Sequence, residues 1–148
     1  MLIENPLAIS AGAFPVLESV HIAGFALSIG MTALVDFRLL GFGLQMQTPA
    51  QIARAFEWWT LGGLIVAVFS GLLIFSTDAD MYYLNWSFLI KMACLLLAIA
   101  FNYTIHRRAL SAGLSPVAGR LVACISLALW VSVIFGGIFI AVVRPGLT

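Results

Sequence analysis

Four long apolar segments separated by short polar ones run through the chain. Each is at least about 18 residues long, and about 20 residues suffice for a helix to cross the hydrocarbon layer of a bilayer. The pattern therefore predicts an all-α protein, a four-helix transmembrane bundle that forms a single domain over residues 1–148. The predicted spans cover residues 14–42, 57–76, 85–106 and 117–143.

The composition agrees with this pattern. Hydrophobic residues make up 63% of the chain and charged residues 9%, and the mean hydropathy is +1.12. Water-soluble domains do not have this balance, and no basic cluster indicates nucleic acid as a partner. We therefore expect a multi-pass membrane protein that is surrounded by lipid, with any chemistry inside the bundle or at its two faces.

Basic residues are distributed unevenly among the loops, and this predicts an orientation. Only Lys91 and Arg144 belong to one side of the membrane. By the positive-inside rule, the loops after the first and third spans face the cytoplasm, and both termini lie on the outer, periplasmic side of a bacterial inner (cytoplasmic) membrane. The basic residues of the inner loops are Arg38, Arg54, Arg107, Arg108 and Arg120.

Residues 1–13 are too short, and too interrupted by Pro6 and Gly12, to cross the bilayer. They could lie along the interface or form a short re-entrant turn, and the pattern leaves both readings open. They carry Glu4 and no positive region, so we do not expect a cleaved signal peptide.

The first span carries a polar stripe on an otherwise apolar helix. The five polar positions fall within roughly 80° of one another at the helical step of about 100° per residue. Intramembrane ionisable groups nearly always point into a bundle or a wet cavity, so we expect the stripe to face the interior. Its members are Glu18, His21, Ser28, Thr32 and Asp36.

The first and third spans run in the same direction, so the depths of their polar residues can be compared. His21 and Lys91 each lie about six residues into a span, or roughly 9 Å deep at 1.5 Å per residue. Asp36 follows His21 by fifteen positions, and His106 follows Lys91 by fifteen. If the two helices are neighbours, the bundle has an outer layer of Glu18, His21 and Lys91, and an inner layer of Asp36, Arg38, Asn102, His106 and Arg107.

A deep histidine in a four-helix membrane bundle is typical of b-type haem sites. The two histidines differ in depth by about 22 Å at 1.5 Å per residue, so one chain cannot ligate one haem with both. We therefore predict His21 as the haem ligand, with Lys91 or Met92 opposite and Glu18 beside it. A five-coordinate iron, or a histidine from a second subunit, stays open.

His21 is also the candidate metal ligand, because Glu18 and His21 form an E-x-x-H pair. Di-iron bundles need two such pairs and further carboxylates, which the helices of this chain do not supply. Cys94 and Cys124 both fall in apolar helices, where we expect them as buried small residues. Small-residue pairs such as Gly62-Gly63 predict close helix packing and are compatible with a homo-oligomer or a larger membrane complex.

Three motifs resemble a group of small bacterial four-helix membrane proteins of uncharacterised function, over roughly the first two thirds of the chain. They are F-P-x-x-E-x-x-H-x-x-G from Phe14 to Gly24, D-F-R-L-L-G from Asp36 to Gly41, and Y-x-x-N-x-x-F-x-x-K from Tyr82 to Lys91.

A more distant likeness, through the early H-x-x-G helix and K-x-x-x-L-L in the third, is to the four-helix membrane protoporphyrinogen oxidases and the copper-resistance membrane proteins. The oxidase resemblance implies bound haem, with His21 and Lys91 as functional residues. The oxidases usually carry a histidine some turns after the lysine, and here the nearest is His106, at the end of the span.

These patterns together predict a redox role: haem-binding electron transfer, or the membrane subunit of a quinone-linked enzyme. Whether the chain is itself an enzyme stays open. The alternatives are a non-catalytic structural or assembly subunit of a larger membrane complex, and a small proton or metal transporter that uses the polar stripe as a path.

Overall fold

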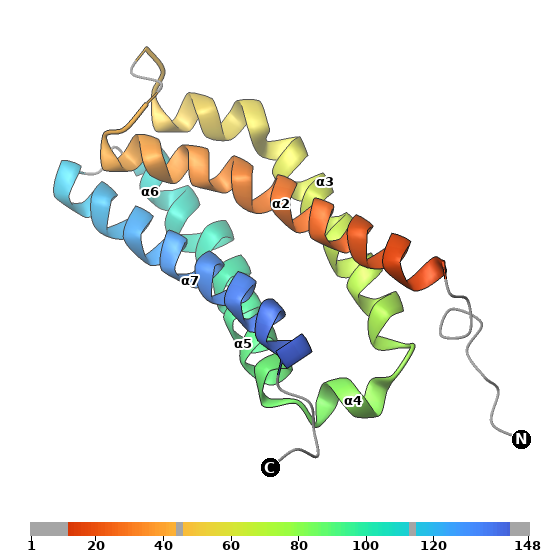
Figure 1. The fold of residues 1–148 in the computed structure, drawn as a ribbon. Helices are drawn as coiled ribbons and strands as arrows, with labels where there is room; N and C mark the ends of the chain where they lie inside the picture. Colours follow the sequence, from red (N-terminus) through yellow and green to blue (C-terminus); the bar gives the residue numbers. More distant parts are fainter. Residues whose placement is uncertain (1–11, 44–45, 113–114, 143–148) are drawn as a thin grey trace, which may run out of the picture.

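The computed structural model describes residues 12–43, 46–112 and 115–142, and their regular structure is entirely helical (Figure 1). Four helices are long and apolar enough to cross a membrane, which confirms an all-α multi-pass membrane protein. The elements are α2 (Ala13–Leu40), α3 (Pro49–Phe75), α4 (Ala79–Tyr83), α5 (Trp86–Phe101), the π-helical turn η1 (Asn102–His106), α6 (Arg107–Ala112) and α7 (Pro116–Val142). Of the N-terminal segment discussed above, residues 1–11 lie outside the described residues.

Local signals set the helix ends. Gly41 ends α2 in the left-handed conformation, at φ 98°, which glycine adopts without steric cost. Helix α3 begins at Pro49, well before the predicted residue 57, because Thr48 and Gln51 form a reciprocal capping box around its first turn. The third span is one continuous helical stretch, Trp86–Ala112, in which η1 joins α5 to α6.

The helices form two packed pairs, α2 with α3 and α5 with α7, and the pairs meet mainly through α2 and α7 (Figure 1). Helices α2 and α5 are therefore not the packing neighbours that the layer prediction supposed, but lie across the bundle interior from each other. We call the end where α2 and α5 begin the Trp86 end, and the opposite end the Arg107 end.

The α2–α3 contact is close because two glycines face each other. A Cβ atom on Gly24 would lie 2.8 Å from the backbone nitrogen of Ala67, and one on Gly63 would lie 2.7 Å from the carbonyl oxygen of Gly24. Both distances are too short for a side chain, so the two backbones touch directly, as small residues allow helices to do in lipid. This contact fixes the α3 backbone beside the polar stripe of α2.

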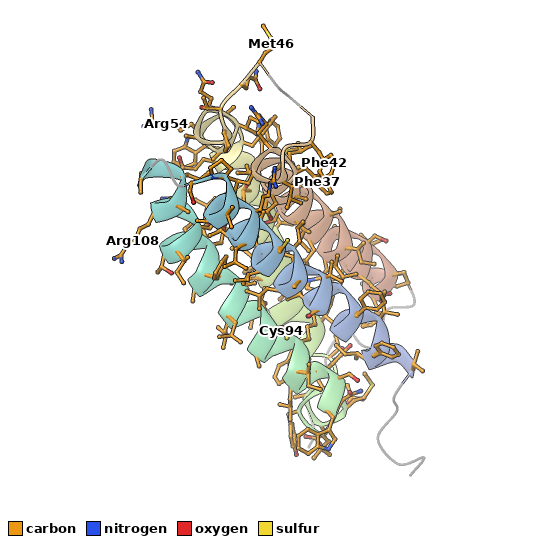
Figure 2. All side chains as sticks on the ribbon, turned by 90° about the vertical axis from the view of Figure 1, so that its left-hand side faces the viewer. Phe37, Phe42, Met46, Arg54, Cys94 and Arg108 are labelled. Atoms are coloured by element: carbon orange, nitrogen blue, oxygen red, sulfur yellow. The ribbon has the colours of Figure 1, made fainter. Side chains whose placement is uncertain are left out.

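The core is small and the outer surface is apolar, as expected for a bundle that lipid surrounds. Leu64, Leu95, Ala98, Trp130 and Val133 form a buried cluster from three spans. Most of the large apolar side chains of the described residues point outward instead. Figure 2 shows Arg54 and Arg108 toward the Arg107 end, with Phe42 and Met46 at the same end and Cys94 nearer the middle.

The two cysteines differ in their surroundings. Both are free thiols; Cys94 is partly buried against the core cluster, whereas Cys124 is exposed. The prediction of a buried small residue is therefore wrong for Cys124, because its position on α7 faces away from the other helices. Composition alone cannot distinguish lipid-facing from core-facing positions in an apolar helix.

Candidate functional site

The predicted meeting of His21 and Lys91 is present at the Trp86 end. The Nζ atom of Lys91 lies 3.4 Å from Nε2 of His21. The two side chains reach across the interior from α2 and α5. His21 and Lys91 thus lie at the same depth in the bundle and meet, although α2 and α5 do not pack side by side.

Helix α3 holds the other edge of the His21 ring. Nδ1 lies 2.7 Å from the carbonyl oxygen of Ala67 and 3.2 Å from the hydroxyl of Ser70. A carbonyl can only accept, so Nδ1 carries the hydrogen and donates it to Ala67. Nε2 of the neutral ring then presents its lone pair toward Lys91, which donates.

Glycines make room for both side chains. A Cβ atom on Gly71 would lie 2.8 Å from Cε1 of His21, and one on Gly136 would lie 2.9 Å from Cβ of Lys91. The ring of Phe25 meets the His21 ring edge to face at 5.0 Å, and its centroid lies 5.2 Å from Nζ of Lys91. The lysine is thus held by an imidazole lone pair and an aromatic face.

The other two residues predicted around His21 lie elsewhere. Glu18 is exposed, one turn before His21 on α2. Its charge acts on Tyr82 of α4: burial above all, then the carboxylates of Glu18 and Asp78, raise the pKa of the Tyr82 phenol. Met92 is 36% exposed, and as the residue after Lys91 it points to another side of α5.

The E-x-x-H pair gains no further ligands. Among the described residues, no group of three histidine, cysteine, aspartate or glutamate side chains could hold a metal ion. His21 as a metal ligand therefore stays a prediction from the sequence.

Asp36 is the centre of the layer at the Arg107 end. It is fully buried, with an exposed fraction of 0%. One carboxylate oxygen lies 2.8 Å from Nε2 of His106, and the other accepts a hydrogen bond of 2.7 Å from the Ser126 hydroxyl. Because the carboxylate accepts, Nε2 of His106 carries a hydrogen. The contact joins three spans through α2, η1 and α7.

The π-helical turn explains why His106 reaches Asp36. Fifteen α-helical residues after Lys91 would carry His106 about 60° past four full turns, to the margin of the face. A π-helical turn holds more residues per turn, so η1 rotates His106 back toward the interior. Such turns occur frequently at functional sites.

The remaining predicted residues of this layer have separate partners. Nε of Arg38 donates to the carbonyl of Gln47 in the following loop, at 2.8 Å. Arg107 pairs with Glu57 of α3 and lies over the ring of Tyr103, 5.0 Å from its centroid. Asn102 lines a recess beside His106.

This recess lies between α2, α3 and the η1–α6 stretch. It is shallow and partly open to the surroundings, and its interior volume of about 50 Å³ has room for only a few water molecules. Pockets that hold small ligands have a similar lining, apolar with a few convergent polar groups, but are larger, about 300–1,000 Å³, so the recess must widen before a ring can enter. Its walls are Thr32, Val35, Ala53, Phe56, Glu57, Thr60, Asn102, Tyr103, His106, Arg107 and Leu110.

The middle of the polar stripe is buried as predicted. Ser28 and Thr32 are almost fully enclosed, and the Thr32 hydroxyl donates to the carbonyl of Ser28 at 3.0 Å. The hydroxyl of Ser28 has no hydrogen-bond partner among the described residues. The stripe therefore faces the interior from His21 to Asp36, and only Glu18 departs from it.

The sequence reasoning missed Ser126, Ser70 and Glu57 as partners of the two histidines and of Arg107. Serines in apolar helices gave no signal, because hydroxyls often bond only to their own backbone. Glu57 was the first residue of the predicted second span, and no partner for it was predicted. The sequence does not indicate that Glu57 pairs with Arg107 of α6, because that contact depends on how the helices pack.

The fold and this site define a class: a four-span membrane protein whose described residues form a partly buried polar contact near one end of the bundle and a buried one near the other. Residues 10–143 match DUF6644, a family of unknown function, and the chain belongs to that family. No curated protein and no solved structure matches the chain.

Proposed function

We propose that the protein is the membrane subunit of a quinone-linked redox enzyme, and that the recess beside His106 receives the quinone ring. The observation that carries the proposal is the combination of the recess with the buried Asp36–His106 contact on its wall. Phe56 and Tyr103 supply aromatic surface for a planar ring, and Thr60 and Asn102 supply hydrogen-bond donors for its carbonyl oxygens.

The chemistry follows from the hydrogen bond that His106 already makes. Its Nε2 donates to Asp36, which leaves Nδ1 for a ligand. When the ring is protonated, the buried carboxylate stabilises the imidazolium, and Nδ1 donates to a quinone oxygen. Reduction of a quinone to a quinol takes up two electrons and two protons. His106 supplies one of the protons, water at the open side of the recess supplies the other, and a redox centre in a partner subunit supplies the two electrons.

The orientation is part of the proposal. Arginines gather at the Arg107 end, so by the positive-inside rule this end faces the cytoplasm of a bacterial inner membrane. Both termini then lie on the periplasmic side, and the quinone site takes its protons from the cytoplasm.

Quinone binding by the purified protein in lipid nanodiscs tests the proposal. We expect decylubiquinone to bind, and His106→Phe to weaken binding by at least tenfold, whereas the matched variant His21→Phe leaves it unchanged. Thr60→Val, which alters the wall without touching the Asp36 contact, should also weaken binding. No binding by the wild type, or equal effects of the two histidine variants, would refute the proposal.

Haem at His21 is the other form of the redox hypothesis. The hydrogen bond from Nδ1 to Ala67 leaves Nε2 as the ring nitrogen that would bind a haem iron. However, Nε2 faces Nζ of Lys91 at 3.4 Å, so haem binding there would require Lys91 to move. A Soret band after haem-replete expression, lost in His21→Ala, is the result that haem binding predicts.

A structural or assembly role is favoured by one observation: the Asp36 contact ties three spans together. Under that hypothesis the polar layers fix helix register, and no small molecule binds in the recess. Asp36→Asn separates the two roles, because the amide oxygen can still accept from His106 and the amide NH2 can donate to the Ser126 hydroxyl, whereas the charge is lost. If the recess is a quinone site, this variant should bind quinone more weakly while the fold stays intact. If the protein is an assembly subunit, the variant should still bind its partner subunits.

A further inference from the structure

We infer that the recess is reached sideways from the bilayer, past the Glu57–Arg107 ion pair, and that its substrate is a quinone with a long apolar tail. This inference rests on the proposed function and adds the route of access and the substrate class. The carrying observation is that the only described ion pair between α3 and α6 joins two residues that line the recess.

The walls of the recess show where it opens. Helix α2 supplies Thr32 and Val35 at the back, α3 supplies one side, and η1 with α6 supplies the other. Helix α7 supplies no lining residue. The opening therefore lies between α3 and α6, on the outside of the bundle, where acyl chains and headgroups surround the protein.

The ion pair at this opening can separate and re-form at little cost in free energy. The side chains of Arg107 and Glu57 are 50% and 44% exposed, and exposed ion pairs contribute little to stability. Arg107 also lies over the ring of Tyr103, so it retains a partner when it leaves Glu57. Separating the pair exposes no buried charge.

The surrounding helices permit such a movement. Helix α3 packs chiefly on α2, through the glycine contact of Gly24 and Gly63, and touches α6 only slightly. The α3–α6 opening can thus widen at the Arg107 end without disturbing the buried α2–α3 contact. The aromatic cluster of Phe75, Tyr82 and Phe88 joins α3 to α5 at the opposite end.

The level of the opening points to a membrane-dissolved ligand. Trp58 and Trp59, 79% and 59% exposed, follow Glu57 directly, and tryptophans gather at the membrane interface. An opening at that level admits a ring from the headgroup region while a long apolar tail stays among the acyl chains. Glu57 and Arg107 thus border the path of the ring, and the tail leaves between α3 and η1.

A cross-linking experiment tests the route. Glu57→Cys and Arg107→Cys are introduced into full-length protein in which Cys94 and Cys124 are replaced by alanine, and a short bifunctional maleimide joins the new thiols. We expect exchange of bound decylubiquinone in nanodiscs to slow by at least tenfold after cross-linking. A monofunctional maleimide on the same variant is the matched control and should leave the exchange rate within twofold.

A second measurement tests the tail. Duroquinone, which has no tail, should bind at least tenfold more weakly than decylubiquinone. Unchanged exchange after cross-linking, or equal affinity for the two quinones, would overturn the inference while leaving quinone binding itself intact. Failure of wild-type protein to bind either quinone would instead remove the proposed function.

Discussion

Replacing Asp36 by alanine should destabilise the bundle more than the loss of any other acidic side chain among the described residues. The change removes the acceptor of two buried hydrogen bonds, from His106 at 2.8 Å and from Ser126 at 2.7 Å. Hydrogen bonds between membrane helices contribute about 1–2 kcal/mol at most. The loss of two such bonds, with both donors left buried, predicts a decrease of about 2–4 kcal/mol in the free energy of unfolding.

Reversible unfolding in mixed detergent micelles, followed by circular dichroism, measures this decrease. Asp80→Ala is the control, because Asp80 is exposed on α4, and it should leave the stability unchanged. The double variant Asp36→Ala, His106→Ala should be less destabilised than the sum of the single variants, since each removes the same contact. If Asp36→Ala proves as stable as the control, or if the two changes are additive, the buried contact does not stabilise the fold.

Three further outcomes follow from local geometry. Gly24→Leu should lower the free energy of unfolding by about 1–3 kcal/mol or more, because the new Cβ would overlap the α3 backbone. Gly30→Leu is the control in the same unfolding assay and should change the stability little, because a Cβ atom there would meet open space. Thr48→Ala should cost about 0.5–2 kcal/mol by removing the α3 cap, visible as increased amide exchange in the first turn of that helix. Burial raises the folded-state pKa of Tyr82, so its stabilising contribution is fully present below the unfolded pKa and is lost as the pH rises through the folded value. Tyr82→Phe should reduce the alkaline loss of stability, and an equal loss in both proteins would contradict the assignment.

Much of the fold followed from the order of apolar and polar residues. Four spans were predicted, and four helices long enough to cross a membrane are present. The helix ends were less predictable: α3 extends back to Pro49 because its cap depends on Thr48 and Gln51, which were read as part of a loop. Hydropathy measures where a helix can lie in lipid, whereas caps decide where it begins.

The site could be predicted in part. Equal depth placed His21 with Lys91, and Asp36 with His106, in common layers, and the side chains of each pair meet in the structure, because the rise of a helix per residue is nearly constant. The prediction placed α2 and α5 as neighbours, however, and the structure sets them across the interior. The pairs still meet because the Lys91 side chain is long enough to cross the interior, and because η1 turns His106 toward Asp36.

The sequence by itself determined the number of spans, the common direction of the first and third, and the depth of each polar group, since all three depend only on position along the chain. The tertiary structure alone decided that Ser126 would bond to Asp36, that Ala67 would accept from His21 and that Glu57 would meet Arg107. Those partners depend on which helix faces which, and glycine contacts and a π-helical turn set that arrangement. Neither feature leaves a signal in the spacing of apolar residues, because both act between helices or on the rotation of a helix about its own axis.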